Sequence, residues 1–110
     1  MRTLAEVVVT IGRVDRIEVT RWIELGWVEP AQRAPEPAFS DLDVARIELI
    51  CDLVRDLEVE EETVPLVLSL IDEIYALRRK LNRLTDAIQG QPEDVRRAVL
   101  DRVAARRTGE

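Results

Sequence analysis

The sequence predicts an all-α protein: a winged helix-turn-helix with a minimal two-stranded wing, then a long dimerising coiled-coil helix and a short C-terminal helix. Three observations predict this architecture. Two short helices with capping signals open the chain, a proline-rich segment with apolar ends follows them, and a heptad repeat runs through the second half. We therefore expect a winged helix-turn-helix at residues 1–59, a dimerisation helix at 60–89 and a C-terminal helix or tail at 90–110.

The composition is that of a small helical domain with an extension. The chain has 110 residues, of which 35% are charged and 4% are aromatic. Its longest apolar runs are too short to cross a bilayer, and Glu6 lies too early for the apolar region of a signal peptide. We therefore expect a cytoplasmic protein with no membrane contact.

Several kinds of chemistry lack the residues they need. The chain has no histidine, and its four glycines are isolated, so the sequence provides neither the commonest general base nor a glycine-rich phosphate loop. Cys51 is the single cysteine and stands among apolar residues, which predicts a buried, unreactive thiol. We expect no catalytic residue, no metal site and no cofactor.

The first two helices each begin at a capping box, in which the N-cap side chain and an acidic residue three positions later bond each other's backbone. The two pairs are Thr3 with Glu6 and Asp15 with Glu18. The helices are expected at residues 4–11 and 16–25, and a glycine follows each, as is typical of a left-handed C-terminal cap. Two short helices joined by a tight turn form a helix-turn-helix unit.

The next segment predicts a small wing. Residues 27–29 are strand-like and are stopped by Pro30, whereas residues 31–38 contain Pro35 and Pro37 and cannot be helical. The segment closes on the apolar pair at residues 38–39. We expect two short extended pieces on either side of a loop, supported by the helices beneath them.

The third helix is expected at residues 41–56, with Ser40 as its cap. It is apolar on more than half of its circumference. The apolar residues are Leu42, Val44, Ala45, Ile47, Leu49, Ile50, Leu53 and Val54. A helix with so wide an apolar surface is predicted to form the centre of the core.

A heptad repeat defines the long helix. The repeating apolar residues are Val67, Leu70, Ile74, Leu77, Leu81, Leu84 and Ile88. A spacing of about 3.5 residues keeps one apolar stripe facing a partner helix, so we expect these residues to mediate dimerisation, although burial within a helical core is the alternative. The heptads permit a parallel or an antiparallel pair. Pro65 favours a helix start, or a bend, near Thr63.

The last segment begins with a helix-start signal. Pro92 is followed by two acidic residues, which suit the positive end of a helix dipole, and a short apolar stripe runs to Val103. This helix is expected either to dock weakly or to order when a partner binds.

Two groups of residues resemble a known family. The stretches 25–30 and 39–43, together with the heptads, resemble the MerR-like regulators over roughly residues 3–88. Within that superfamily, the turn Gly26–Pro30 and the stretch Leu68–Ile74 are similar to the chaperone-modulator family CbpM.

This resemblance implies a function in protein contact. Members of the CbpM family bind the J-domain of a DnaJ-like co-chaperone, CbpA, and inhibit its co-chaperone activity, while keeping the architecture of a DNA-binding protein. The resemblance implies the same partner here, and an antiparallel homodimer.

The charges of residues 1–59 agree with that implication. These residues include seven arginines and twelve carboxylates, which gives a net charge of −5. DNA affinity depends on basic residues that neutralise phosphates. A basic J-domain helix would suit an acidic surface. The candidate J-domain-binding residues are Glu24, Trp27, Glu29, Asp72 and Glu73, with Trp22 as another possible aromatic anchor. Ordinary solvated surface is the alternative for the carboxylates, and the protein core for the tryptophans.

Two other functions stay open. A dimeric MerR-like transcriptional regulator is the main alternative, and Arg16, Arg21 and Arg33 favour it. DNA-binding relatives usually carry an arginine in the wing just before the third helix, where this chain has Pro37, Ala38 and Phe39, so we do not expect nucleic acid to be the partner. A dimerisation module with a different partner is the third possibility.

Overall fold

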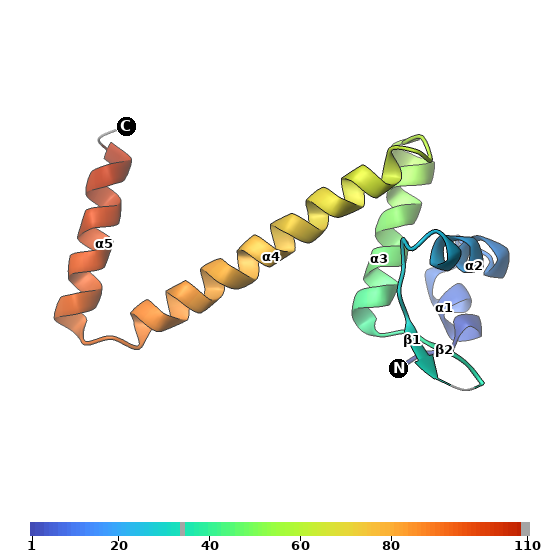
Figure 1. The fold of residues 1–110 in the computed structure, drawn as a ribbon, viewed down its shortest axis with the longest axis horizontal. Coiled ribbons are helices and arrows are strands. Elements are labelled where there is room, and N and C mark those ends of the chain that lie inside the picture. The colour runs from blue at the N-terminus through green and yellow to red at the C-terminus, as the bar shows by residue number, and fades with distance from the viewer. Residues whose placement is uncertain (34, 109–110) are drawn as a thin grey trace. The chain divides into compact units, whose positions relative to one another are not determined.

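The computed structural model describes residues 1–33 and 35–108, which form two compact units, Met1–Ser69 and Leu70–Glu110. The first unit holds the N-terminal helices, the hairpin and the third helix (Figure 1). Its elements are α1 (Leu4–Ile11), α2 (Arg16–Glu24), β1 (Ala31–Arg33), β2 (Glu36–Ala38), α3 (Asp41–Cys51) and the π-helix η1 (Asp52–Asp56). Helix α4 (Val64–Gln89) begins in the first unit, and α5 (Glu93–Thr108) belongs to the second. The predicted fold class is confirmed.

Three capping boxes fix where the first three helices begin. Both halves of the box form at each of the N-caps Thr3, Asp15 and Ser40. The shortest of these hydrogen bonds runs from the Glu18 amide to Asp15 Oδ1, at 2.8 Å. Gly12 and Gly26 take left-handed conformations, with φ of +74° and +78°. The helix-turn-helix thus forms within one residue of the predicted bounds, because local signals determine both ends of each helix.

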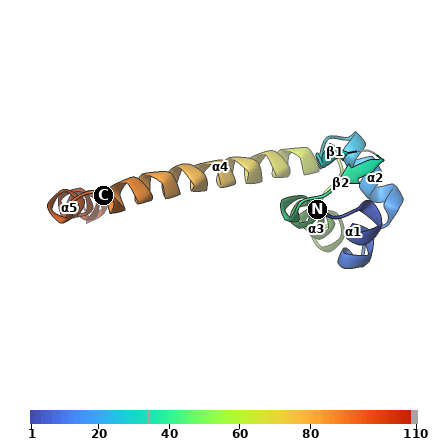
Figure 2. The ribbon, with the colours of Figure 1, turned by 90° about the horizontal axis from the view of Figure 1, so that it is seen from below.

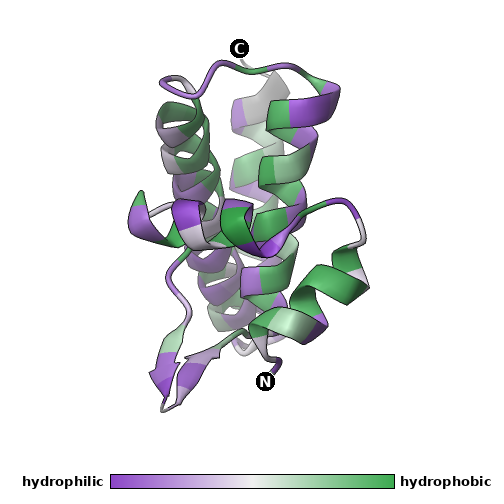
Figure 3. Ribbon diagram, turned by 90° about the vertical axis from the view of Figure 1, so that its right-hand side faces the viewer, coloured by the Kyte–Doolittle hydropathy of each residue, from purple (hydrophilic) through white to green (hydrophobic). Residues whose placement is uncertain are grey.

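The predicted two-stranded wing forms, but both strands lie closer to the loop than predicted, at Ala31–Arg33 and Glu36–Ala38. The strands lie inside the proline-rich segment and pair antiparallel, with Ala31 opposite Ala38 and Arg33 opposite Glu36. Residues 27–29 form no strand, and the side chains of Trp27 and Val28 are buried in the core. The hairpin is hydrophilic in Figure 3, in contrast to the helices, which carry hydrophobic segments.

Phe39 ties the wing to the N-terminus. Its backbone exchanges two hydrogen bonds of 2.8 Å with Arg2 in an isolated antiparallel bridge, and Figure 2 places the N-terminus beside the hairpin. The Phe39 side chain is fully buried. This long-range pairing holds the short wing against the helices, which two three-residue strands could not do alone.

A single hydrophobic core lies within the first unit. Its centre is α3, from which Val44, Ile47 and Ile50 are buried, and the first turns of α4 join it through Val64 and Leu68. The prediction that α3 forms the centre of the core therefore holds. Leu42 is an exception: its side chain is 81% exposed, because it lies in the first turn of α3 on the side away from the buried residues.

The predicted third helix changes its winding near its end. Residues 41–51 are α-helical and Asp52–Asp56 form a π-helix, in which the Leu57 amide donates to the Asp52 carbonyl at 2.9 Å. The sequence predicted one continuous α-helix to residue 56. Glu58, with φ of +51°, then reverses the chain toward α4.

Helix α4 begins at Val64, so Pro65 lies in its first turn, where a missing amide costs no helical hydrogen bond. The predicted start near Thr63 is confirmed. Helix α5 begins just after Pro92, as predicted, with Glu93 and Asp94 in its first turn.

Candidate protein-interaction surface

The outward face of α2 carries the first candidate surface. Arg16, Ile17, Thr20, Arg21 and Glu24 line a shallow hollow there. Their spacing places them on one side of the helix, opposite the buried Val19 and Trp22. In helix-turn-helix proteins this second helix is the one that reads DNA. Here its face carries both signs of charge and an isoleucine that is 80% exposed.

Intramolecular carboxylates engage most arginines of the first unit. Arg21 pairs with Glu61, Arg55 with Glu18, and Arg13 with both Asp52 and Asp56. Arg2 lies 3.9 Å from Asp41, and Arg46 donates to the Trp27 carbonyl. These ion pairs are partly exposed and screened by water, so each adds little to stability. Their main effect is to neutralise the positive charge that a phosphate would need.

Two arginines of residues 1–59 have no ion pair within the described part of the chain, namely Arg16 and Arg33. Arg16 lies on α2 and Arg33 on β1. Glu24 lies on the same face of α2 as Arg16 and Arg21, so this face carries both signs of charge. The face of α2 is therefore not uniformly positive, as a surface that binds a polyphosphate backbone usually is.

The predicted partner-binding residues fall into both units. Glu24, Trp27 and Glu29 lie in the first unit, and Asp72 and Glu73 lie on the part of α4 that belongs to the second. The four carboxylate residues are exposed. Trp27 is only 6% exposed and stacks on Trp22 with the ring centroids 6.4 Å apart, so it could contact a partner only through a small part of its ring. The role of all five residues in binding stays a prediction.

A smaller, more enclosed pocket lies beside the tryptophan pair. Trp22, Trp27, Val54 and Val59 form its apolar walls. Glu18, Arg21 and Glu61 complete the lining. Arg21 therefore lies between this pocket and the hollow on the outer face of α2.

The heptad residues of α4 form the second candidate surface. The side chains of Leu70, Ile74, Leu77, Leu81 and Leu84 are between 51% and 61% exposed, and Val67 and Ile88 are half-buried. A stripe of five large apolar residues is more than scattered exposure on a soluble surface. The chain leaves it accessible to a partner, and its role in dimerisation stays a prediction.

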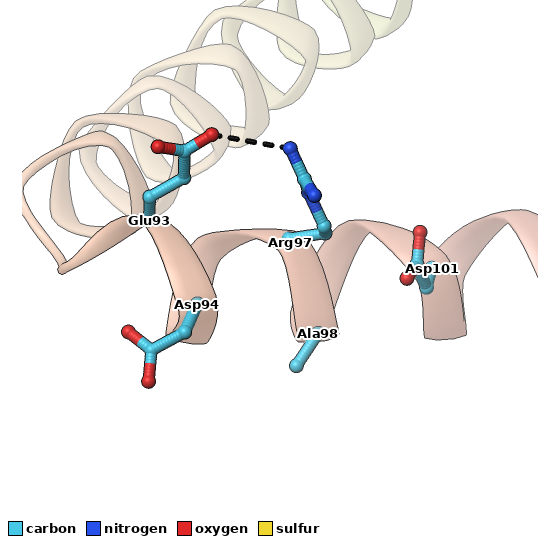
Figure 4. A pocket seen from close by; sticks show the side chains of 5 residues that line it. All are labelled: Glu93, Asp94, Arg97, Ala98 and Asp101. Carbon is cyan, nitrogen blue, oxygen red and sulfur yellow. Dashed lines mark hydrogen bonds and ion pairs between the residues drawn. The ribbon is translucent and has the colours of Figure 1, made fainter.

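The hollow on α5 is lined by one alanine and four charged residues of the helix surface. Figure 4 shows its residues, all from α5, with Arg97 Nη2 donating to Glu93 Oε1 at 3.1 Å. Both side chains are about 70% exposed, so this pair adds only a few tenths of a kcal/mol to the helix. Among the described residues, no three potential metal ligands come together.

Cys51 is fully buried in the core, as predicted, and burial raises the pKa of its thiol above the ordinary value of 9.0. The folded protein therefore keeps the thiol neutral at pH values where the unfolded chain forms a thiolate. We expect the free energy of unfolding to fall as pH rises past 9.0, because ionisation then favours the unfolded state. Urea denaturation of the wild type and of Cys51→Ala checks this: the variant should lack that part of the pH dependence, and an equal slope would contradict it.

Ile17 is a surface residue that sequence reasoning missed. The signal was present: the buried positions of α2, including Val19 and Trp22, place position 17 on the opposite side of the helix. An isoleucine there has no packing role. Single exposed apolar residues are common on protein surfaces, and Val9 and Leu42 are exposed to the same extent.

The fold defines the class of protein: a winged helix-turn-helix with a long helix after it. A family model described as MerR HTH family regulatory protein matches residues 4–86. The chain belongs to this family of regulatory proteins. No curated protein matches the sequence significantly. Within the described part of the chain, no helix combines the length and the apolar character that a bilayer crossing requires.

Proposed function

We propose that the chain is a dimeric chaperone modulator, which binds the J-domain of a DnaJ-like co-chaperone of the CbpA type and inhibits its co-chaperone activity. The observation that carries this proposal is the neutralised face of α2. There Arg21 is paired with Glu61, while Ile17 and Glu24 are exposed to solvent. A helix that reads DNA presents basic and polar groups at these positions, whereas here Glu24 and Glu61 offset the charges of Arg16 and Arg21.

Charge complementarity supports a J-domain as the partner. The resemblance to the CbpM family implies a partner with a basic helix, and residues 1–59 have a net charge of −5. Opposite charges orient two proteins as they meet and raise the association rate. The exposed Ile17 adds an apolar contact, which contributes more to affinity than a charge at the rim.

The exposed stripe of α4 supports a homodimer. A second copy offers the same stripe and buries both, whereas water would otherwise contact about half of each side chain. Such a homodimer has two first units, one from each copy, and each of them offers a surface to a partner.

Size-exclusion chromatography of the purified protein mixed with its cognate J-domain protein tests the proposal. A complex that co-elutes at micromolar concentrations is the expected result. Two independent peaks at these concentrations would count against the chaperone-modulator function.

DNA binding is the second candidate function. The family favours it, and so do Arg16 and Arg33, which have no ion pair among the residues that the structure describes. A gel-shift assay with promoter DNA distinguishes the two functions: sequence-specific binding that weakens with salt would favour a transcriptional regulator.

Reversing the charge of Glu24 should weaken J-domain binding. Glu24→Lys places a third cation beside Arg16 and Arg21 on the hollow of α2, so we expect affinity for the J-domain to fall roughly fivefold, mainly through a slower association rate. Surface plasmon resonance measures both rates.

The matched control for this variant is Asp101→Lys, which changes the net charge equally but lies on α5. It should leave the affinity near the wild-type value. Equal losses in the two variants would mean that only net charge matters and that the face of α2 does not contact the J-domain.

A further inference from the structure

The tryptophan pocket of the first unit combines aromatic walls with an acidic lining. Trp22 and Trp27 stack on each other, and the pocket beside them also contacts Val54 and Val59. Two carboxylates and one guanidinium line it: Glu61 pairs with Arg21, and Glu18 pairs with Arg55, which lies outside the lining. Trp22 and Trp27 are 5% and 6% exposed, so each ring offers only a small part of its surface to the pocket. Apolar walls of this kind suit the methylene stem of a long side chain.

We propose that this pocket receives an arginine or lysine side chain of the partner, with its stem along the tryptophans and its cationic group on Glu61. The proposal rests on the proposed function, since it names the place where the basic J-domain helix is anchored. It adds Glu61 and Trp22 to the residues that contact the partner.

Glu61 is the carboxylate that is available for exchange. Both oxygens of Glu18 are engaged within the fold, Oε1 by the Asp15 amide and Oε2 by Arg55. Glu61 instead pairs with Arg21, and the two side chains are 52% and 59% exposed. An ion pair this exposed is held weakly, so an incoming cation can replace Arg21 at little cost.

Arg21 is then an internal competitor for the pocket. When the partner's cation binds Glu61, Arg21 is released toward the hollow that it shares with Glu24 on the outer face of α2. Partner binding would therefore remove the Arg21 guanidinium from the tryptophan pocket and add it to the hollow on α2. Removal of Arg21 should therefore strengthen partner binding. If Arg21 contacted DNA instead, its removal would weaken DNA binding.

Nα-acetyl-arginine methylamide is a suitable probe, and its citrulline counterpart, which has the same shape but no charge, is the control. The indole N–H signals of Trp22 and Trp27, the two tryptophans of the chain, report on the pocket in ¹H–¹⁵N NMR spectra. We expect both signals to shift saturably with millimolar arginine derivative and to stay in place with the citrulline derivative.

Variants of the pocket sharpen the test. Arg21→Gln should bind the arginine derivative up to about fivefold more tightly, because it removes the competing ion pair. Glu61→Gln should lose the saturable shift, whereas Glu62→Gln, its exposed neighbour outside the pocket, should keep it. Equal shifts with both derivatives, no saturable shift, or weaker binding by Arg21→Gln would each overturn the inference.

The same experiment separates this inference from the proposed function. Saturable indole shifts in a protein that does not bind the J-domain would keep the pocket and reject the chaperone-modulator function. A J-domain complex that forms equally well with Glu61→Gln would reject the pocket and keep the function.

Discussion

Replacing Phe39 by alanine is expected to lower the free energy of unfolding by about 3–5 kcal/mol. The side chain is fully buried, and its backbone is paired with Arg2, so the cavity cannot close by a simple shift of the wing. Urea denaturation followed by circular dichroism at 222 nm measures the change. The loss is large relative to the total stability of a domain of this size.

Leu42→Ala is the matched control for this prediction, because Leu42 lies close by in the sequence but its side chain is 81% exposed. Its free energy of unfolding should stay within about 0.5 kcal/mol of the wild-type value. Comparable losses in the two variants would contradict the placement of Phe39 in the core and Leu42 outside it.

Replacing Leu77 by glutamate is expected to convert a homodimer into a monomer. Leu77 lies in the middle of the heptad stripe and is 61% exposed in the single chain. A twofold dimer would lose the apolar contact of both copies, about 4 kcal/mol in total, which raises the dissociation constant about a thousandfold. Sedimentation equilibrium at micromolar concentrations should give twice the chain mass of 12.6 kDa for the wild type and 12.6 kDa for the variant.

Arg79→Glu is the control, since Arg79 is exposed and lies outside the heptad stripe of the same helix. It should remain a dimer. A wild-type protein that sediments at 12.6 kDa would show that the stripe does not mediate dimerisation.

The sequence predicted those parts of the fold that local chemistry determines. The capping boxes at Thr3, Asp15 and Ser40 determine the helix starts, and Gly12 and Gly26 determine helix ends, because each acts within a few residues of itself. Pro65 likewise located the start of α4.

Features that depend on distant contacts could not be predicted. The wing strands lie inside the proline-rich segment, where Ala31 pairs with Ala38, and Phe39 beside them pairs with Arg2 far away in the sequence. The π-helical end of α3 also escaped prediction. Arg13, from the turn after α1, contacts Asp52 and Asp56 there. The hydrophobic periodicity of α3 gives no sign of this long-range contact.

The candidate site was predicted only in part. The excess of carboxylates over arginines in residues 1–59 is visible in the sequence, and so is the exposure of charged residues such as Glu24. The pairing of Arg21 with Glu61 joins residues 40 positions apart, so only the folded chain reveals it. Burial of Trp27 against Trp22 is likewise a tertiary outcome.

Fluorescence anisotropy of a labelled cognate J-domain, titrated with the purified protein at physiological salt, tests most directly whether this winged helix-turn-helix contacts protein instead of DNA. We predict a saturable rise in the micromolar range that unlabelled promoter DNA does not reverse. No rise with the J-domain, alongside a saturable and salt-sensitive rise with labelled promoter DNA, would contradict the proposal and assign the neutralised face of α2 to DNA after all.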